Sequence, residues 1–226
     1  MPRWGPLRGD RVFPTMADCL NFIQGMLKGL VSLHLHCIAH RDLQASNAVM
    51  DHYQSETVVP IKSWQSTRDL FGGQDSVIYN IIDFDYAFII PPYCLYHEAE
   101  ESLTTSIHYP RDTRQGELEY NPFAYDVGAL GVMFCNMFQD LILHAPMMTP
   151  LLDMMVTSDV SRRLAAVEAL HFFQHGLLPS PSDEQLAMAP PPLSPYRVVT
   201  VEDDRWAGLP SDFVAKWKEH CTPSSS

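Results

Sequence analysis

Residues 40–47 read HRDLQASN, and residues 81–87 read IIDFDYA. In the first stretch Asp42 lies five residues before Asn47, and in the second Asp83 follows a run typical of a strand. Transfer of a γ-phosphoryl group requires one carboxylate that accepts or orients the proton of the nucleophile. It also requires a second carboxylate and a neutral oxygen ligand that together hold Mg²⁺. Asp42 is the candidate for the first role, and Asp83 and Asn47 are the candidates for the second.

A predicted helix leads into the first stretch. Leucine and isoleucine recur at helical spacing over residues 20–30, and Thr15 with Asp18 forms a variant of the capping box. The sequence therefore predicts a largely buried helix that begins near Thr15 and delivers the chain to His40. After the first stretch, SVIYNIIDF at 76–84 predicts a strand, because β-branched and aromatic residues are concentrated there.

Two further helices are predicted in the second half of the chain. Residues 123–143 form one apolar helical segment. Residues 158–176 form the other, with a cap at Ser158 or Asp159 and an end at Gly176. The proline-rich sequence that follows predicts a tether.

The sequence resembles protein kinases at four places. HRDLQASN resembles the catalytic loop H-R-D-L-x-x-x-N at all five fixed positions, and DFD at 83–85 resembles the D-F-G metal motif with Asp85 in place of glycine. DVGALGVMF from Asp126 is similar to the kinase helix D-x-W-S-x-G-V, and DVSRRLAAVEAL from Asp159 is similar to the late segment D-x-x-x-R-P-T-A-x-E-x-L. The matches lie in kinase order over roughly residues 14–176. The helix before IAHRD and the insert before IIDFDYA are similar to kinase-like proteins common in mushroom-type fungi.

The resemblance implies a mainly α fold, the carboxy-terminal lobe of a protein kinase-like protein, with a small β-hairpin or strand element and without the amino-terminal β lobe. The expected organisation is a hinge-like segment over 1–13, the lobe over 14–178, and a proline-rich tether and tail over 179–226. No GxGxxG loop precedes His40, where a kinase carries one together with a strand lysine. We therefore expect a chain that begins at about the hinge, with the missing lobe as a partner and an exposed apolar rim where that lobe would dock.

The resemblance assigns catalysis to the first stretch. Asp42 is the expected catalytic carboxylate, and His40, Arg41 and Gln44 complete the catalytic set of the loop. Gln44 stands where Ser/Thr kinases carry a lysine that touches the γ-phosphate. A neutral amide can hydrogen-bond a phosphate but cannot neutralise its charge.

ATP and Mg²⁺ are the cofactors that the resemblance implies. Asn47 and Asp83 are the expected ligands of the nucleotide and the metal, and Asp85 adds a further candidate metal ligand. The Cβ of Asp85 restricts the backbone at a position where the family has glycine. Its charge would either recruit metal or repel ATP.

Two residues outside these stretches are expected to hold the lobe together. Asp126 would be the buried carboxylate that braces the backbone of the catalytic loop around His40 and Arg41. Arg163 would be the structural arginine of the late segment, and Asp112 in the string YPRD is its candidate partner.

Three functions are open. The first is ATP-dependent phosphorylation of protein Ser or Thr residues, with this chain alone expected to be inactive for want of the glycine-rich loop and the lysine. The second is a non-catalytic, kinase-like module that binds a protein partner. The third is a small-molecule phosphotransferase of the aminoglycoside and choline kinase type, because IDFDYA resembles the I-D-x-D motif of that group. Arg41 argues against the third, since that group reads H-G-D.

The composition excludes two classes of partner. The chain of 226 residues has 27 acidic and 15 basic residues, which gives a formal net charge of −12 at pH 7. Nucleic acid and anionic membranes both attract basic surfaces, so neither is expected as a partner. The longest largely apolar run, residues 127–138, is too short to span a membrane. Five cysteines without CxxC spacing predict reduced thiols and a cytoplasmic or nuclear protein.

Overall fold

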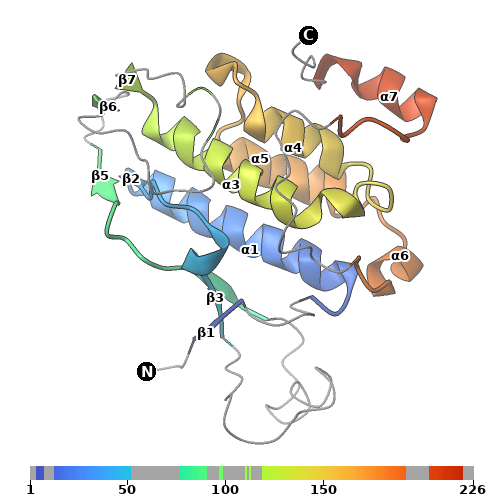
Figure 1. Ribbon diagram of the computed structural model, residues 1–226, viewed down its shortest axis with the longest axis horizontal. Helices are drawn as coiled ribbons and strands as arrows, with labels where there is room; N and C mark the ends of the chain where they lie inside the picture. Colours follow the sequence, from blue (N-terminus) through green and yellow to red (C-terminus); the bar gives the residue numbers. More distant parts are fainter. Residues whose placement is uncertain are drawn as a thin grey trace, which may run out of the picture.

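A bundle of helices forms the centre of the structure (Figure 1). The computed structural model describes residues 4–7, 13–51, 77–90, 97–98, 110, 112, 119–191 and 204–220. The bundle consists of α1 (Met16–Leu35), α3 (Pro122–Phe138), α4 (Met148–Val156) and α5 (Ala166–Phe172). Helix α1 packs against α3 and α5, and α3 packs against α4. The expected mainly α fold is confirmed for these ranges.

The start of α1 follows the capping box that the sequence predicts. The Thr15 hydroxyl accepts the backbone N–H of Asp18 at 3.2 Å, and the Asp18 carboxylate accepts the backbone N–H of Thr15 at 3.1 Å. These reciprocal bonds satisfy two N–H groups that the helix itself leaves without partners. The helix then runs to Leu35, shortly before the first stretch.

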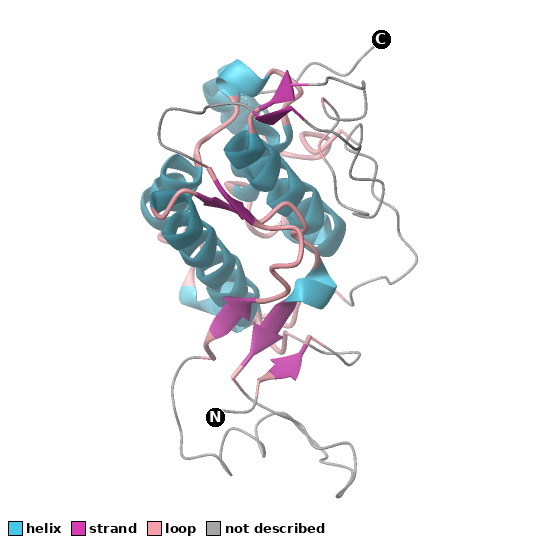
Figure 2. Cartoon of the chain, turned by 90° about the vertical axis from the view of Figure 1, so that its left-hand side faces the viewer, coloured by secondary structure: helices cyan, strands magenta, loops and turns pink. Residues whose placement is uncertain are grey.

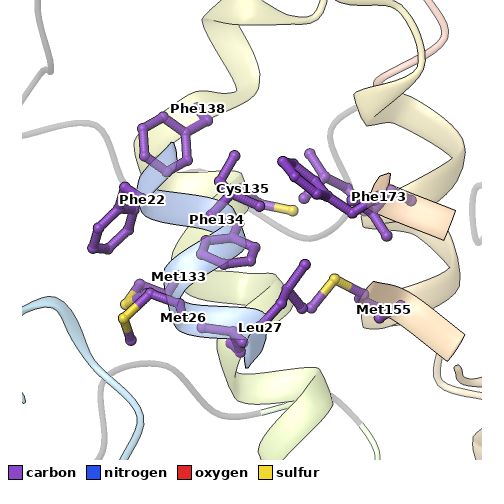
Figure 3. Packing of buried hydrophobic residues seen from close by; sticks show 14 of the residues in the cluster. Phe22, Met26, Leu27, Met133, Phe134, Cys135, Phe138, Met155 and Phe173 are labelled. Atoms are coloured by element: carbon purple, nitrogen blue, oxygen red, sulfur yellow. The ribbon is translucent and has the colours of Figure 1, made fainter. Parts of the chain in front are cut away.

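Aromatic side chains fill the space between α1 and α3 (Figure 3). The ring of Phe22 in α1 lies 5.9 Å from that of Phe138 and 6.3 Å from that of Phe134, measured between centroids. All three side chains are fully buried, and Met155 and Phe173 belong to the same cluster. Burying a side chain of this size contributes about 1.5–3 kcal/mol.

Gly131 allows α3 and α4 to pack closely. A Cβ at this position would lie 2.8 Å from the Cβ of Met155 and 2.8 Å from Cγ1 of Val156. Both separations are shorter than van der Waals contact, and interiors packed this densely have no room for an added methyl group. Only glycine therefore permits this distance between the two helices.

A three-stranded antiparallel sheet lies at one end of the bundle (Figure 2). Its strands, in spatial order, are β1 (Gly5–Pro6), β3 (Ala48–Met50) and β4 (Tyr79–Ile81). Strands β3 and β4 pair with Ala48 opposite Ile81 and Met50 opposite Tyr79. The strand predicted over 76–84 is thus present as the shorter β4.

Two short strand pairs complete the β structure of the described residues. Strand β2 (Ile38–Ala39) pairs with β5 (Phe88–Ile89), and β6 (His97–Glu98) pairs with β7 (Glu119–Tyr120). The pairing of β2 with β5 brings the residues just before His40 beside the residues just after Ala87. The expected small β element is therefore confirmed.

The predicted third helix begins later than expected. A 3₁₀ turn, η4 (Val160–Arg162), comes first, and Asp159 accepts the backbone N–H of Ser161 at 3.1 Å. That local bond offers the backbone an alternative to the helix. Helix α5 starts only at Ala166, so the prediction of a cap at Ser158 or Asp159 for this helix is wrong.

The end of the third helix also differs from the prediction. Helix α5 passes at Phe172 into the π-helix η5 (Phe173–Leu177). Gly176, the predicted end, therefore lies inside a helical turn. The second predicted helix is confirmed as α3, but it stops at Phe138 and continues as the 3₁₀ turn η3 (Gln139–Leu141).

Helix α4 has no counterpart among the predicted helices. Its sequence, MTPLLDMMV, is buried along its whole length, so it lacks the polar face that makes an amphipathic helix recognisable. Pro150 lies in the first turn, where its missing N–H costs no intrahelical bond. None of the described helices is long and apolar enough to cross a membrane.

The region predicted as tether and tail contains helices in its described parts. They are α6 (Asp183–Ala187), α7 (Ser211–Trp217) and the 3₁₀ turn η6 (Lys218–His220). Residues 192–203, which include most of the proline-rich sequence, lie outside the described ranges.

Arg205 anchors this carboxy-terminal segment to α4. Its guanidinium forms an ion pair with Asp153 at 2.5 Å, and the indole N–H of Trp206 donates to the same carboxylate at 2.7 Å. Both charged residues are buried. Figure 1 shows α7 at the edge of the bundle, beyond α4. The segment is therefore held by a buried ion pair, whose partners are costly to separate.

Candidate active site

Asp126 fixes the backbone of the loop that carries Asp42. Its carboxylate accepts the backbone N–H groups of His40 and Arg41, each at 2.7 Å. His34, in the last turn of α1, makes a third contact, with its Nε2 3.2 Å from the same carboxylate. Asp126 is fully buried, so these groups replace the water that its charge has lost. The predicted brace of the loop backbone is confirmed.

Arg41 has a left-handed backbone, with φ at +67°. This conformation costs a residue with a Cβ roughly 1–2 kcal/mol. The guanidinium lies over the ring of Phe88 in β5, with 4.8 Å from Cζ to the ring centroid. Burial raises the pKa of the neighbouring Tyr120 hydroxyl, and the charge of Arg41 opposes that rise. Arg41 therefore ties the loop to β5 and β7.

Both ring nitrogens of His40 are bonded to the backbone. Nδ1 accepts the N–H of Asp42 at 3.3 Å, so the proton lies on Nε2, which donates to the carbonyl oxygen of Ile82 at 3.1 Å. The ring packs edge-on against Phe84, with 5.1 Å between centroids. His40 therefore holds the loop of Asp42 against the segment of Phe84.

Asp42 and Asn47 are in direct contact. The 3₁₀ turn η1 (Ala45–Asn47) brings Asn47 back, and its amide donates to the Asp42 carbonyl oxygen at 2.9 Å and to the carboxylate at 2.8 Å. The amide nitrogen of Gln44 lies 3.1 and 3.0 Å from the two carboxylate oxygens. Asp42 is only 6% exposed. Two neutral amides therefore orient this carboxylate without adding positive charge.

Ile82 joins Asp83 to the same loop. Its N–H donates to the carbonyl oxygen of Asn47 at 2.9 Å, while its own carbonyl oxygen accepts the His40 proton. Asp83 comes next, with φ at +69° and an exposed side chain. Within the described ranges, the Asp83 carboxylate makes no hydrogen bond. The structure thus brings Asp42 and Asn47 into contact. It leaves Asp83 and Asp85 at an exposed edge.

The oxygen atoms of this region suit Mg²⁺. The side-chain nitrogen of Asn47 donates to Asp42, so a metal would bind Oδ1. This oxygen accepts the Ser46 hydroxyl at 3.3 Å and keeps a second lone pair. The exposed carboxylate of Asp83 is the second candidate ligand, and Mg²⁺ prefers such oxygens. A bound ion would neutralise phosphate charge there. Among the residues that the structure describes, no group of three or more His, Cys, Asp or Glu could hold a metal by itself.

Arg163 joins three segments of the chain. Its guanidinium forms an ion pair with Asp112 and donates to the carbonyl oxygens of Thr157, at 2.6 Å, and Ala124, at 3.0 Å. Gly128 in α3 packs directly on this group, since a Cβ there would lie 2.9 Å from Nη1 of Arg163. The predicted pairing of Arg163 with Asp112 is confirmed.

The contact of His34 with Asp126 could not be predicted from the sequence. The two residues are 92 positions apart, and His34 reads as an ordinary polar residue near the end of a helix. Its ring also packs edge-on against Phe123, with 4.9 Å between centroids. The one local signal is its place in the last turn of the helix that leads into the loop.

Apolar side chains gather at the exposed edge beside Asp83. Phe84 is 47% exposed, Tyr86 is 41% exposed and Ile82 is 40% exposed. Large apolar side chains exposed together commonly mark a surface that contacts another molecule. The apolar rim for a missing lobe stays a prediction, and these three residues are candidates for it.

No protein-family model and no curated protein matches this chain. A function for it therefore rests on the residues themselves and on the contacts around Asp42.

Proposed function

We propose that this chain is the lobe of a protein kinase-like phosphotransferase, which phosphorylates Ser or Thr residues of a protein with Mg²⁺ and ATP only where a second lobe supplies the glycine-rich loop and the lysine. The observation that carries the proposal is the contact between Asp42 and Asn47 on a loop whose backbone is held by Asp126. Phosphoryl transfer depends mainly on positioning and charge neutralisation. A buried, hydrogen-bonded carboxylate on a fixed backbone can position an attacking hydroxyl.

Each residue has a defined role in this reaction. Asp42 accepts the proton of the substrate hydroxyl while the hydroxyl oxygen of the substrate bonds to the γ-phosphorus. The bond between the γ-phosphorus and the β-phosphate oxygen breaks, and ADP leaves. Asn47 and Asp83 would hold Mg²⁺, which would neutralise charge on the phosphates. His40 and Asp126 are positioning residues, because they contact the loop and its neighbouring backbone.

A non-catalytic module that binds a protein is the second candidate, and Gln44 favours it. The Gln44 amide lies within hydrogen-bond distance of both carboxylate oxygens of Asp42. A carboxylate held on both oxygens is less available to a hydroxyl, and a neutral amide does not balance the charge of a γ-phosphate. In this alternative, the apolar edge at Ile82 and Phe84 would contact the partner.

Phosphate transfer from radiolabelled ATP to a Ser/Thr peptide library tests the proposal. The full chain is compared with Asp42→Asn and with Glu184→Gln, which alters an exposed carboxylate in α6. The chain alone should transfer little phosphate, because it lacks the glycine-rich loop and the lysine. With a separately expressed amino-terminal lobe that supplies both, we expect transfer by the wild type and by Glu184→Gln, and a loss of at least about 100-fold in Asp42→Asn.

Calorimetry with Mg²⁺ and ATP separates the two candidates. Nucleotide binding without transfer would favour the binding module. Transfer that persists in Asp42→Asn, or a chain that neither binds nucleotide nor transfers phosphate when the amino-terminal lobe is added, would contradict the phosphotransferase.

A further inference from the structure

A single side-chain amide lies across the carboxylate of Asp42. The Gln44 nitrogen is 3.1 Å from Oδ1 and 3.0 Å from Oδ2 of Asp42, whereas the Asn47 amide bonds Oδ2 alone, at 2.8 Å. A carboxylate oxygen has two lone pairs, so Gln44 and Asn47 together fill Oδ2. Among the described residues, Gln44 is the one whose side chain bonds Oδ1. Gln44 therefore controls the oxygen that Asn47 leaves open.

This contact competes with the role that the proposed reaction gives to Asp42. A substrate hydroxyl can donate its proton only from within hydrogen-bond distance of the carboxylate. Asp42 is buried, and the Gln44 amide already donates to both of its oxygens. The hydroxyl must therefore displace a donor that is in place before the substrate arrives.

The side chain of Gln44 can leave Asp42 while the loop keeps its shape. The backbone of Gln44 is extended, with φ at −145° and ψ at 162°, and its carbonyl oxygen accepts the N–H of Asn47 at 2.9 Å. The side chain itself is unbranched and half-buried. Such side chains rotate between discrete staggered rotamers, so the amide can turn away from Asp42 without breaking a backbone bond.

We propose that Gln44 is an autoinhibitory contact, which holds the Asp42 carboxylate in the resting chain and releases it when the amide bonds the γ-phosphate of a bound nucleotide. The inference rests on the proposed function, because it concerns the same carboxylate. A terminal phosphate carries more negative charge than a carboxylate and is a strong acceptor for an N–H group. A ligand shifts an equilibrium only through contacts that differ between the two states, and ATP offers Gln44 a phosphate that ADP lacks.

Carbodiimide-driven coupling of a small amine to carboxyl groups tests the resting contact in the full chain. Gln44→Met removes the amide and keeps a side chain of similar length. Gln24→Met is the matched control, because Gln24 is also half-buried but lies in α1. Mass spectrometry should find Asp42 coupled about tenfold faster in Gln44→Met than in the wild type, since a hydrogen bond to a charged group is worth at least that factor. Equal coupling of Asp42 in the wild type and Gln44→Met, or an equal rise in Gln24→Met, would overturn the proposal.

Nuclear magnetic resonance of the side-chain amides tests the release. The ¹⁵N-labelled chain is mixed with the amino-terminal lobe, and the signal of Gln44 is assigned by its loss in Gln44→Met. We expect this signal to shift with Mg²⁺ and a non-hydrolysable ATP analogue and to stay in place with Mg²⁺ and ADP. A signal that stays in place with both nucleotides, or shifts equally with both, would overturn the proposal. Neither measurement uses phosphate transfer, so a failure of the phosphotransferase would appear separately, as absent transfer alongside the expected coupling rates and shifts.

Discussion

The carboxylate of Asp126 accepts the backbone N–H of Arg41 at 2.7 Å, at a residue whose φ is +67°. Left-handed conformations of this kind persist only where the surrounding structure enforces them. The bond from Asp126 to His40, also 2.7 Å long, holds the adjacent peptide and makes the two N–H groups point at one buried charge. The shape of the catalytic loop thus depends on a residue 85 positions away.

Asp126→Asn should lower the stability of the lobe. Asparagine has one acceptor oxygen in place of two, so at least one of the N–H groups of His40 and Arg41 would lose its partner, at roughly 1–3 kcal/mol for each. Chemical denaturation measures the loss. Asp83→Asn is the control, because Asp83 is exposed and asparagine tolerates its left-handed backbone. Equal stability of the wild type and Asp126→Asn would show that the brace is not needed.

Gly131→Ala should destabilise the fold, whereas Gly29→Ala should not. The added methyl at 131 would meet Cβ of Met155 at 2.8 Å, and such overpacking costs about 1–3 kcal/mol. At 29 the nearest atom is the flexible Cδ1 of Ile81, at 3.1 Å, and alanine gains up to about 1 kcal/mol in helix propensity. The melting temperatures of the two variants should therefore move in opposite directions, and a Gly131→Ala variant as stable as the wild type would refute the close contact of α3 with α4.

Cys19 should resist alkylation in the native protein. Burial and, to a lesser degree, the charge of Asp18 raise the pKa of its thiol to about 12, so at pH 8 about one molecule in ten thousand carries the reactive thiolate. Mass spectrometry after brief iodoacetamide treatment should find Cys37, which is partly exposed, labelled well before Cys19. Labelling of Cys19 should appear only after denaturation, and equal labelling in the native state would contradict its burial.

Gln44→Lys should increase phosphate transfer if the proposed function is correct. A lysine ammonium would bring to Asp42 and the γ-phosphate a charge that the amide lacks, and one well-placed group of this kind is worth at least about tenfold in rate. Initial rates with a Ser/Thr peptide, in the presence of an added amino-terminal lobe that carries the glycine-rich loop and the lysine, measure the change. Gln24→Lys adds the same charge on α1 and serves as the control. An equal gain in both variants would point to net charge and not to the loop.

Local motifs made the start of α1 and the loop predictable. Thr15 and Asp18 are three residues apart, and a capping box acts over that distance. The contact between Asp42 and Asn47 likewise lies within a single turn of chain. The brace by Asp126 was predictable only because the order of several motifs resembles that of a known family.

Contacts between distant or wholly apolar segments could not be predicted in this way. Arg205 and Asp153 are 52 positions apart, and no local sequence pattern near either residue indicates that they pair. Helix α4 lacks a polar face, so its periodicity is hidden. The cap predicted at Asp159 failed because the same side chain can bond a 3₁₀ turn as readily as a longer helix.

The pairing of Arg205 with Asp153 also bears on where an expressible fragment can end. A truncation at residue 178, where the sequence turns proline-rich, would keep the Asp153 carboxylate inside α4 and delete the guanidinium and the indole that bond it. Removing one partner of a buried ion pair costs roughly 3–5 kcal/mol, a large share of the roughly 5–15 kcal/mol by which domains are stable. A fragment that ends at residue 178 should therefore be less stable than the full chain, and a stable fragment should extend past Trp206.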